Sequence, residues 1–226
     1  MNWDDKGFLI SKLKYNENSV IADLFTEDHG RVAGIIFGAS SKKIKGYLQI
    51  GNLFHINCNY KNETKIGSFK VEIINPYTPY YFNNINKLHC VTSAMSMIKL
   101  LTAENQINKN IFILIKKFFN ILEEKEWEKK YLFWELELLK LSGFELNLEK
   151  IVQKKINDNK IEYFVQSSTE KKNVPSFFID KKIQNLEKSE LIKGYNLITN
   201  YLEKNVLNPN NLSHPNSRLD FINLLR

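Results

Sequence analysis

The sequence predicts an α+β protein in which a small barrel of short antiparallel strands precedes a helical domain. Two observations carry this prediction. Residues 6–75 hold short apolar runs separated by turn residues, with no room for crossover helices between them. Beyond Pro79 the apolar residues recur at helical spacing instead. A chain of 226 residues is long enough for two such domains, each with its own core.

The N-terminal region contains five candidate strands. The segment Asp28-His29-Gly30 supplies turn chemistry, because glycine adopts positive φ without a steric penalty. The runs on either side of this turn therefore form a hairpin, and the remaining runs extend it into a barrel of five antiparallel strands. The expected strands cover residues 8–13, 20–25, 31–37, 53–60 and 67–74.

The segment Asn75-Pro76-Tyr77-Thr78-Pro79 breaks the strand pattern, since each proline lacks a ladder donor and disfavours the helical region for its predecessor. We place the domain boundary here, which gives a barrel domain of residues 1–78 and a helical domain of residues 79–226. The next helices are expected at 88–98, 107–121 and 127–141, the last ending at Ser142-Gly143.

The third of these helices is apolar around most of its circumference, which predicts a central position in the helical domain. A polar, lysine-rich insert at about residues 151–176 then interrupts the helices. Its one strand-like stretch, residues 161–165, predicts a small hairpin or irregular loop. Helical spacing resumes at residues 191–202 and again at 217–225.

The formal net charge of +7 favours a polyanionic partner. Nearly all the basic residues are lysines, and Asn and Ile are also abundant, as expected of a genome rich in A and T. The positions of the lysines are therefore more informative than their number.

The sequence also favours a cytoplasmic protein that does not enter a membrane. Cys58 and Cys90 lie far apart without a CxxC spacing, and the acidic start at Asp4-Asp5 is unlike a signal peptide. The longest apolar run, residues 111–115, is well short of the ~20 residues of a transmembrane helix.

Catalytic and metal-binding motifs are missing from the sequence. The four histidines fall in no HExxH, HxH or Cys/His spacing, and there is no GxSxG, GxxxxGK[ST] or GxGxxG. We therefore expect neither an enzyme nor a cofactor. A nucleic-acid-processing enzyme is kept only as a third hypothesis, after the two binding functions described below.

Residues 38–45 (Gly-Ala-Ser-Ser-Lys-Lys-Ile-Lys) are the best candidate for a binding surface. Small residues let the backbone approach phosphate, and lysines release counterions when they bind it. The alternative is a solvated surface loop. Small barrels bind single strands by adding aromatic stacking to a basic groove, although for each aromatic residue taken singly core packing is the more common role. The stacking candidates are Tyr15, Phe37, Tyr47 and Tyr60.

The helical region offers a second kind of surface. Its apolar residues exceed what one thin bundle obviously buries, which leaves room for a groove that receives a partner peptide. The alternative is an ordinary core. The residues concerned include Phe118, Phe119, Phe133 and Trp134.

With these segments in view, the chain resembles the RecO family of bacterial DNA repair proteins. The similarity is an ordered set of short segments that spans nearly the whole chain and is hard to obtain by chance. The segments are residues 7–10 (Gly-Phe-Leu-Ile), 15–20 (Tyr-Asn-Glu-Asn-Ser-Val), 25–31 (Phe-Thr-Glu-Asp-His-Gly-Arg), 38–43, Leu48-Gln49, Gly67, Val71-Glu72, 139–144 (the family's Leu-x-x-x-Gly-Phe) and Ser217-Arg218-Leu219.

The resemblance implies an N-terminal OB-fold and a C-terminal helical domain. It also implies a non-enzymatic recombination mediator, cytoplasmic and associated with the nucleoid. Such a protein binds single- and double-stranded DNA, anneals complementary strands and works with RecR to load RecA onto DNA coated by single-strand-binding protein (SSB). The SSB C-terminal tail is bound by the helical domain in this family. Within the matching segments, the resemblance implies that phosphate is contacted by Arg31, Lys42, Lys43 and Lys45.

The chain departs from the family pattern at one point. Some relatives carry a four-cysteine zinc site in the insert, whereas residues 145–180 here contain no cysteine or histidine, and Ile151 stands about where the first ligand would fall. We therefore expect no zinc. Packing of the insert is then expected to come from Tyr163, Phe164, Phe177 and Phe178.

The alternative to the DNA mediator, from a different class, is a protein-interaction adaptor. In that reading the helical groove binds a partner peptide and the barrel is only a scaffold. Oligomeric state and the preference for DNA over RNA are not predicted by the sequence.

Overall fold

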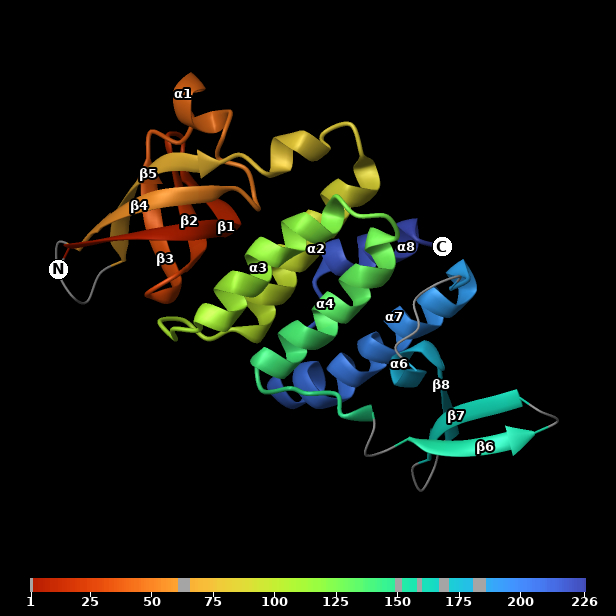
Figure 1. The fold of residues 1–226 in the computed structure, drawn as a ribbon. Coiled ribbons are helices and arrows are strands. Elements are labelled where there is room, and N and C mark those ends of the chain that lie inside the picture. Colours follow the sequence, from red (N-terminus) through yellow and green to blue (C-terminus); the bar gives the residue numbers. More distant parts are fainter. Residues whose placement is uncertain (1, 61–65, 149–151, 158–159, 167–170, 181–185) are drawn as a thin grey trace. The chain divides into compact units, whose positions relative to one another are not determined.

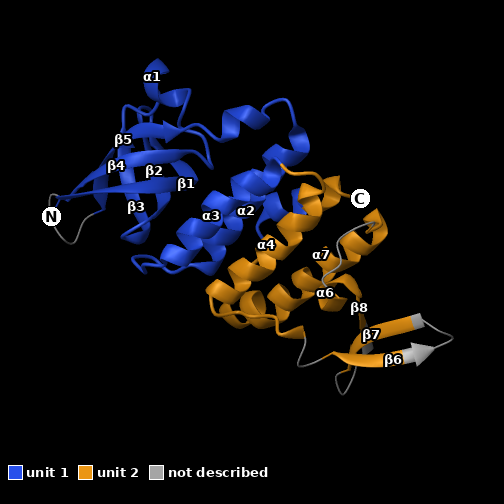
Figure 2. Cartoon of the chain, viewed as in Figure 1, with its two compact units in different colours: residues 1–123, 215–221 blue, residues 124–214, 222–226 orange. Residues whose placement is uncertain are grey.

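The structure, a computed structural model, describes residues 2–60, 66–148, 152–157, 160–166, 171–180 and 186–226. Strands come first, followed by helices, a small three-stranded sheet and further helices (Figure 1). The chain divides into two compact units, residues 1–123 with 215–221 and residues 124–214 with 222–226 (Figure 2). The expected division after residue 78 stays a prediction.

The first unit contains a closed five-stranded barrel of OB-like form. The strands lie in the order β1-β2-β3-β5-β4, and β4 pairs with β1 to complete the barrel. All five predicted strands are confirmed, although the first is much longer than expected. Their bounds are β1 Asn2–Asn16, β2 Ser19–Thr26, β3 Gly30–Phe37, β4 Leu53–Asn59 and β5 Gly67–Asn75.

One pairing corrects the expectation of a wholly antiparallel barrel, because β3 and β5 run parallel where they meet. Their short contact pairs Gly34 with Gly67 and Ile35 with Ser68. A Cβ atom on Gly34 would lie 2.4 Å from the Phe69 ring, and one on Gly67 would lie 2.9 Å from the Tyr60 ring. Glycine at both positions therefore lets β3 and β5 approach closely enough to close the barrel.

Alternating residues of each strand fill the barrel. Leu24 of β2 and Val32 of β3 pair across the sheet and are both buried in this core. The β1 register shifts between Leu9 and Ser11, so that Lys12 and not Ser11 then pairs with Ala22. The core consists of Leu9, Ala22, Leu24, Val32, Ile36, Ala39, Leu48, Phe54, Ile56, Cys58, Phe69 and Val71.

Helices of the first unit pack against the outer face of β1. The Phe8 ring lies 5.3 Å from that of Phe112 and 5.9 Å from that of Phe119. Asn84 and Asn108 accept hydrogen bonds from the first turns of the two main helices and so act as N-caps. The elements are the 3₁₀ turn η1 (Thr78–Tyr81), α2 (Ile85–Leu101) and α3 (Lys109–Leu122).

The second unit begins with α4 (Trp127–Leu141), which ends where Ser142-Gly143 predicted, with Gly143 at φ +84°. The insert forms an antiparallel sheet of three strands, more than a single hairpin. The remaining elements are β6 (Gln153–Asn157), β7 (Lys160–Gln166), β8 (Lys171–Val174), α6 (Phe177–Asp180), α7 (Lys188–Leu202), the π-helical turn η2 (Glu203–Leu207) and the 3₁₀ turn η3 (Asn208–Asn210).

Aromatic side chains connect the insert to α4, largely as expected. Phe164, Phe177 and Phe178 are buried, Tyr163 is half-buried, and the Phe133 ring lies 6.1 Å from those of Phe177 and Phe178. The position of Ile151 lies outside the described residues.

The apolar residues that suggested a peptide groove are mostly core. Phe118, Phe119 and Trp134 are buried, and Phe133 is half-buried against α6. At these residues the structure therefore shows the ordinary core that the sequence left as the alternative to a groove, since their apolar faces already have partners within their own units. None of the helices in the described ranges is both long and apolar enough to cross a bilayer.

The last helix, α8 (Asn216–Leu224), is divided between the two units. Its first part returns to the first unit, where the Ser217 hydroxyl donates to Ser96 Oγ of α2 at 2.8 Å. Arg218, in the same part, is fully buried.

Two glycines with nearly the same positive φ predict different effects on stability. Gly30 has φ +70° and Gly38 has φ +69°. A Cβ atom at Gly30 would lie 2.0 Å from the Gln106 carbonyl oxygen, whereas one at Gly38 would meet nothing within 4 Å. Gly38→Ala should lower the free energy of unfolding by about 1 kcal/mol through backbone strain alone. Gly30→Ala should lower it by about 1–3 kcal/mol more because the loop must move.

Urea unfolding of the two variants, followed by circular dichroism, measures this difference. Equal losses for the two variants would contradict the close packing of the Gln106 loop on the β2–β3 turn.

Candidate nucleic-acid interface

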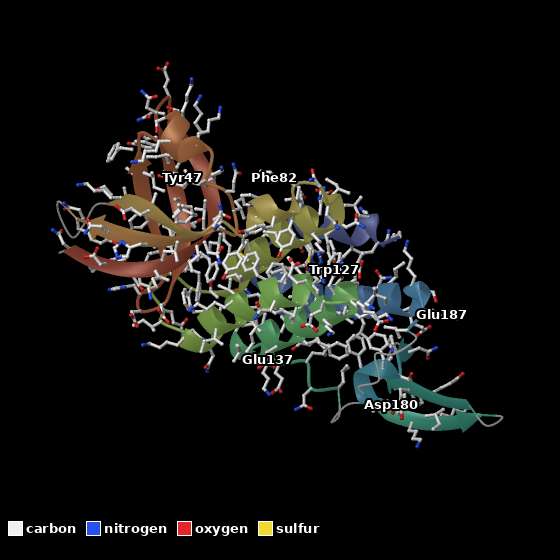
Figure 3. The ribbon with its side chains drawn as sticks, turned by 45° about the horizontal axis from the view of Figure 1, so that its top comes forward. Tyr47, Phe82, Trp127, Glu137, Asp180 and Glu187 are labelled. Atoms are coloured by element: carbon white, nitrogen blue, oxygen red, sulfur yellow. The ribbon has the colours of Figure 1, made fainter. Side chains whose placement is uncertain are left out.

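Lys42, Lys43 and Lys45 lie on α1 (Lys42–Lys45), a single helical turn that follows β3 at one end of the barrel (Figure 1). Gly38 turns the chain into this segment with positive φ, and the Ser41 hydroxyl accepts a hydrogen bond from the Ile44 amide. All three lysine side chains are exposed and make no ion pair with any residue that the structure describes. Side chains tipped with nitrogen project from this end of the barrel in Figure 3.

The loop that carries α1 is attached to the β1–β2 hairpin. The Ala39 amide donates to the Asn18 carbonyl at 2.9 Å, and the Ser40 hydroxyl donates to the Asn18 side chain at 2.6 Å. These bonds hold the lysine turn beside the end of the barrel and restrict its movement.

Two further lysines, missed by sequence reasoning, join this end of the barrel. Lys12 and Lys14 of β1 line a pocket of about 350 Å³ together with Lys45 and one acidic residue, Glu17. The Lys12 ammonium donates to the Leu48 carbonyl at 2.5 Å, and burial lowers its pKa below the ordinary value. Lys12 and Lys14 are two residues apart and therefore share one face of the strand, but the register shift after Leu9 determines which face that is.

We call Lys12, Lys14, Lys42, Lys43 and Lys45 the lysine rim. Two of the four stacking candidates lie beside it: the side chain of Tyr15 is 55% exposed and that of Phe37 is 59% exposed. Phe37 pairs with Ser19, which pairs with Asn16, so both aromatic residues belong to this end of the barrel.

Tyr47 and Tyr60 are placed differently. Both pack against the barrel core, Tyr47 with its ring 6.1 Å from that of Phe54 (Figure 3). Tyr60 follows β4 at the opposite end of the barrel, where burial and the neighbouring Cys58 thiol raise its pKa. The structure therefore does not bring these two rings together with the lysine rim.

Arg31 is also separated from the lysines. It begins β3 whereas α1 follows the end of that strand, a separation of roughly 20 Å at ~3.3 Å per residue. Its guanidinium donates to the Lys99 carbonyl at 2.5 Å and to Glu104 at 3.2 Å, and the side chain is only 15% exposed. Its position thus suits support of the loop after α2 better than contact with a phosphate beside the lysine rim.

The turn at His29 has a structural role, as its sequence predicted. Gly30 takes positive φ, and the His29 amide donates to the Thr26 hydroxyl at 3.1 Å. Sequence reasoning missed the partners of the His29 ring: Nδ1 lies 2.8 Å from the nearly buried Asp5 carboxylate, and Trp3 stacks on the ring at 4.0 Å. Within the described ranges no three His, Cys, Asp or Glu residues are grouped so that they could hold a metal ion.

Comparison with known proteins matches two family models to successive parts of the chain. The family model described as "Recombination protein O N terminal" matches residues 1–77, and the one described as "Recombination protein O C terminal" matches residues 83–213. The first therefore covers the barrel, and the second covers the insert and the helices before α8.

Individual relatives point to the same family. A protein named "DNA repair protein RecO" from Rickettsia canadensis is 34% identical over 150 residues, 66% of this chain and 62% of the relative. Proteins of the same name are 30% identical over 161 residues in Ehrlichia chaffeensis, covering 70% of this chain and 65% of the relative, and 29% identical over 150 residues in Roseobacter denitrificans, covering 66% and 62%. The matched regions span somewhat less than two thirds of these relatives. With both family models matched in order along an OB-like barrel and its helices, the chain belongs to the Recombination protein O family.

Proposed function

We propose that this protein is a non-enzymatic mediator of DNA repair and recombination that binds DNA through the lysine rim. The observation that carries the proposal is the gathering of these five lysines at one end of an OB-like barrel, four of them exposed. Three of the five come from α1 and two from β1, so the fold concentrates charge that is dispersed in the sequence.

Lysine side chains of the rim would contact the phosphate backbone of DNA. An ammonium group is a compact point charge that attracts phosphate without reading a base, and each neutralised phosphate releases counterions. Tyr15 and Phe37 add exposed rings on which unpaired bases stack, which favours single strands. Affinity with little sequence preference suits a protein that handles DNA of any sequence.

The finer activities follow from the resemblance to the family. We propose that the chain binds both single- and double-stranded DNA and anneals complementary strands. We further propose that it cooperates with RecR to load RecA onto SSB-coated DNA, with the SSB C-terminal tail as a protein ligand. No metal or cofactor is needed for any of these steps, which involve binding and not bond cleavage.

A specific surface favours the second candidate function, a protein-interaction adaptor. Tyr80, Phe82 and Ile85 in and after η1 are 75%, 56% and 59% exposed, with Phe82 labelled in Figure 3. They adjoin a pocket of about 470 Å³ in the same unit, which Lys87 lines with a cation and Glu123 with a carboxylate, and in which Tyr77 stacks on Phe119. An acidic peptide with apolar residues, such as an SSB tail, fits this chemistry.

Reversing two charges of the lysine rim tests the DNA site. If about four lysines neutralise phosphates of a single strand, log affinity should fall against log salt concentration with a slope of roughly −3, and Lys42→Glu with Lys43→Glu should flatten it by roughly 1.4. Fluorescence anisotropy of a labelled oligonucleotide at several salt concentrations measures the slope.

The matched control is Lys154→Glu with Lys155→Glu, an adjacent exposed pair in β6 that changes the net charge equally. The assignment fails if both double variants flatten the slope equally, or if affinity does not depend on salt.

The exposed aromatic residues give a second test. Tyr15→Ala and Phe37→Ala should each weaken binding of a single strand by about 5- to 100-fold through lost stacking, with less effect on a duplex of equal length. Tyr80→Ala, which removes a still more exposed ring elsewhere, should leave the DNA affinity unchanged and weaken binding of an acidic SSB tail peptide. If the unaltered protein binds the peptide but not DNA, and Tyr80→Ala loses the peptide, the adaptor is favoured.

Annealing of complementary strands precoated with SSB tests the mediator activity as a whole. Adding the protein should accelerate duplex formation, and the Lys42→Glu, Lys43→Glu variant should lose most of this acceleration because the strands are no longer neutralised. A rate unchanged by the unaltered protein would rule out annealing while leaving DNA binding to be judged from anisotropy.

A further inference from the structure

The end of the barrel opposite the lysine rim contains a small pocket walled by rings. Its volume is about 160 Å³, below the usual range of ~300–1,000 Å³ for drug-sized ligands and suited to a single planar heterocycle. The β1 start, the β2–β3 turn, the end of β4 and the loop between α2 and α3 all contribute to it. The lining residues are Trp3, His29, Val32, Tyr60, Asn105 and Ile107.

One wall of the pocket is a pair of stacked rings. The Trp3 and His29 rings lie 4.0 Å apart with 14° between their planes. Asp5, whose side chain is 2% exposed, holds this pair in place: Oδ2 lies 2.8 Å from His29 Nδ1 and accepts the Asp28 amide at 2.9 Å. The rings are therefore fixed before any ligand arrives, which lowers the entropy lost on binding.

The other wall brings an amide group to the pocket. Asn105 has φ +58°, and its backbone N–H donates to the Arg31 carbonyl at 2.8 Å. Gly30 allows this loop to lie against the β2–β3 turn, because a Cβ atom there would collide with the Gln106 carbonyl. The Asn105 side-chain amide makes no hydrogen bond to other described residues and so keeps two donors and one acceptor for a ligand.

We propose that this pocket holds one unstacked nucleobase of a bound single strand. The inference rests on the proposed DNA-binding function. Flat rings bind any base through its π-face, and an asparagine amide pairs with a base edge, best with that of adenine. Apart from His29, the residues that line the pocket carry no charge, which matches a neutral base better than a charged side chain.

The position of the pocket suits a strand that begins at the lysine rim. The two sites lie at opposite ends of β3, roughly 20 Å apart at ~3.3 Å per residue. A single OB-fold covers ~4–16 nucleotides, so one strand reaches both sites. Phosphates then bind the lysine rim while a base some nucleotides away enters the pocket.

The test monitors the environment of the Trp3 ring by nuclear magnetic resonance. The protein is labelled with 5-fluorotryptophan, and the Trp3 resonance, one of three tryptophan signals, is assigned with Trp3→Phe. An oligodeoxyadenylate of about eight nucleotides should shift this resonance, whereas an abasic strand of equal length should bind the lysine rim and leave the resonance unchanged. Free 2′-deoxyadenosine at millimolar concentration should also shift it, because the pocket does not need phosphate.

A pair of matched variants locates the base. Asn105→Gly removes the amide and relieves the positive φ, and should weaken oligodeoxyadenylate binding by about 3- to 10-fold without changing abasic-strand binding. Asn211→Gly makes the same change at φ +53° outside the pocket and should leave both affinities unchanged.

The proposal is overturned if the two glycine variants behave alike, or if abasic and adenylate strands shift Trp3 equally. A Trp3 response to a peptide but to no nucleic acid or nucleoside also overturns it. Failure of the proposed function looks different: neither strand then binds, while deoxyadenosine still shifts the Trp3 resonance if the pocket accepts a base.

Discussion

Closure of the barrel between β3 and β5 is the constraint on which the rest of the first unit depends. Only two residue pairs join these strands, and both strands place a glycine at the contact so that the Phe69 and Tyr60 rings can fill the space. A closed barrel has no free edge, which removes the unpaired strand that invites aggregation. It also places the start of β5, and the end of β4 that pairs with it, beside β3.

The two ends of the barrel differ in chemistry as a result. The end that carries α1 presents ammonium groups with two exposed rings, and the other end presents a ring-walled pocket with one amide. The first can hold a phosphate chain of any sequence through point charges. The second has the directional groups that a single planar ligand requires. A strand in contact with both is held by charge at one point and by stacking at another, which are weakened by different conditions because only the first is screened by salt.

The elements were predictable from the sequence because their signals are local. Alternating apolar residues, the glycine turn and helical spacing gave five strands and the main helices, and the lysines of α1 are adjacent in the chain. What was missed depends on contacts between distant residues. The register shift that turns Lys12 and Lys14 towards α1, the bonds from Arg31 to Lys99 and Glu104, and the approach of Asn105 to Trp3 leave no pattern in one sequence. Arg31 resembled a surface cation because its partners lie some seventy residues away, at the end of α2 and in the loop that follows it.

The divided helix α8 has a consequence for how the protein is made. Residues 215–221 belong to the first unit, where Ser217 bonds to Ser96 and Arg218 is buried, although almost a hundred residues of the second unit separate them from α3. A ribosome therefore releases the barrel, α2 and α3 long before the segment that completes their packing emerges. Until then Ser96 of α2 lacks the hydrogen bond from Ser217. Vectorial synthesis thus leaves the first unit unfinished until almost the whole described chain exists.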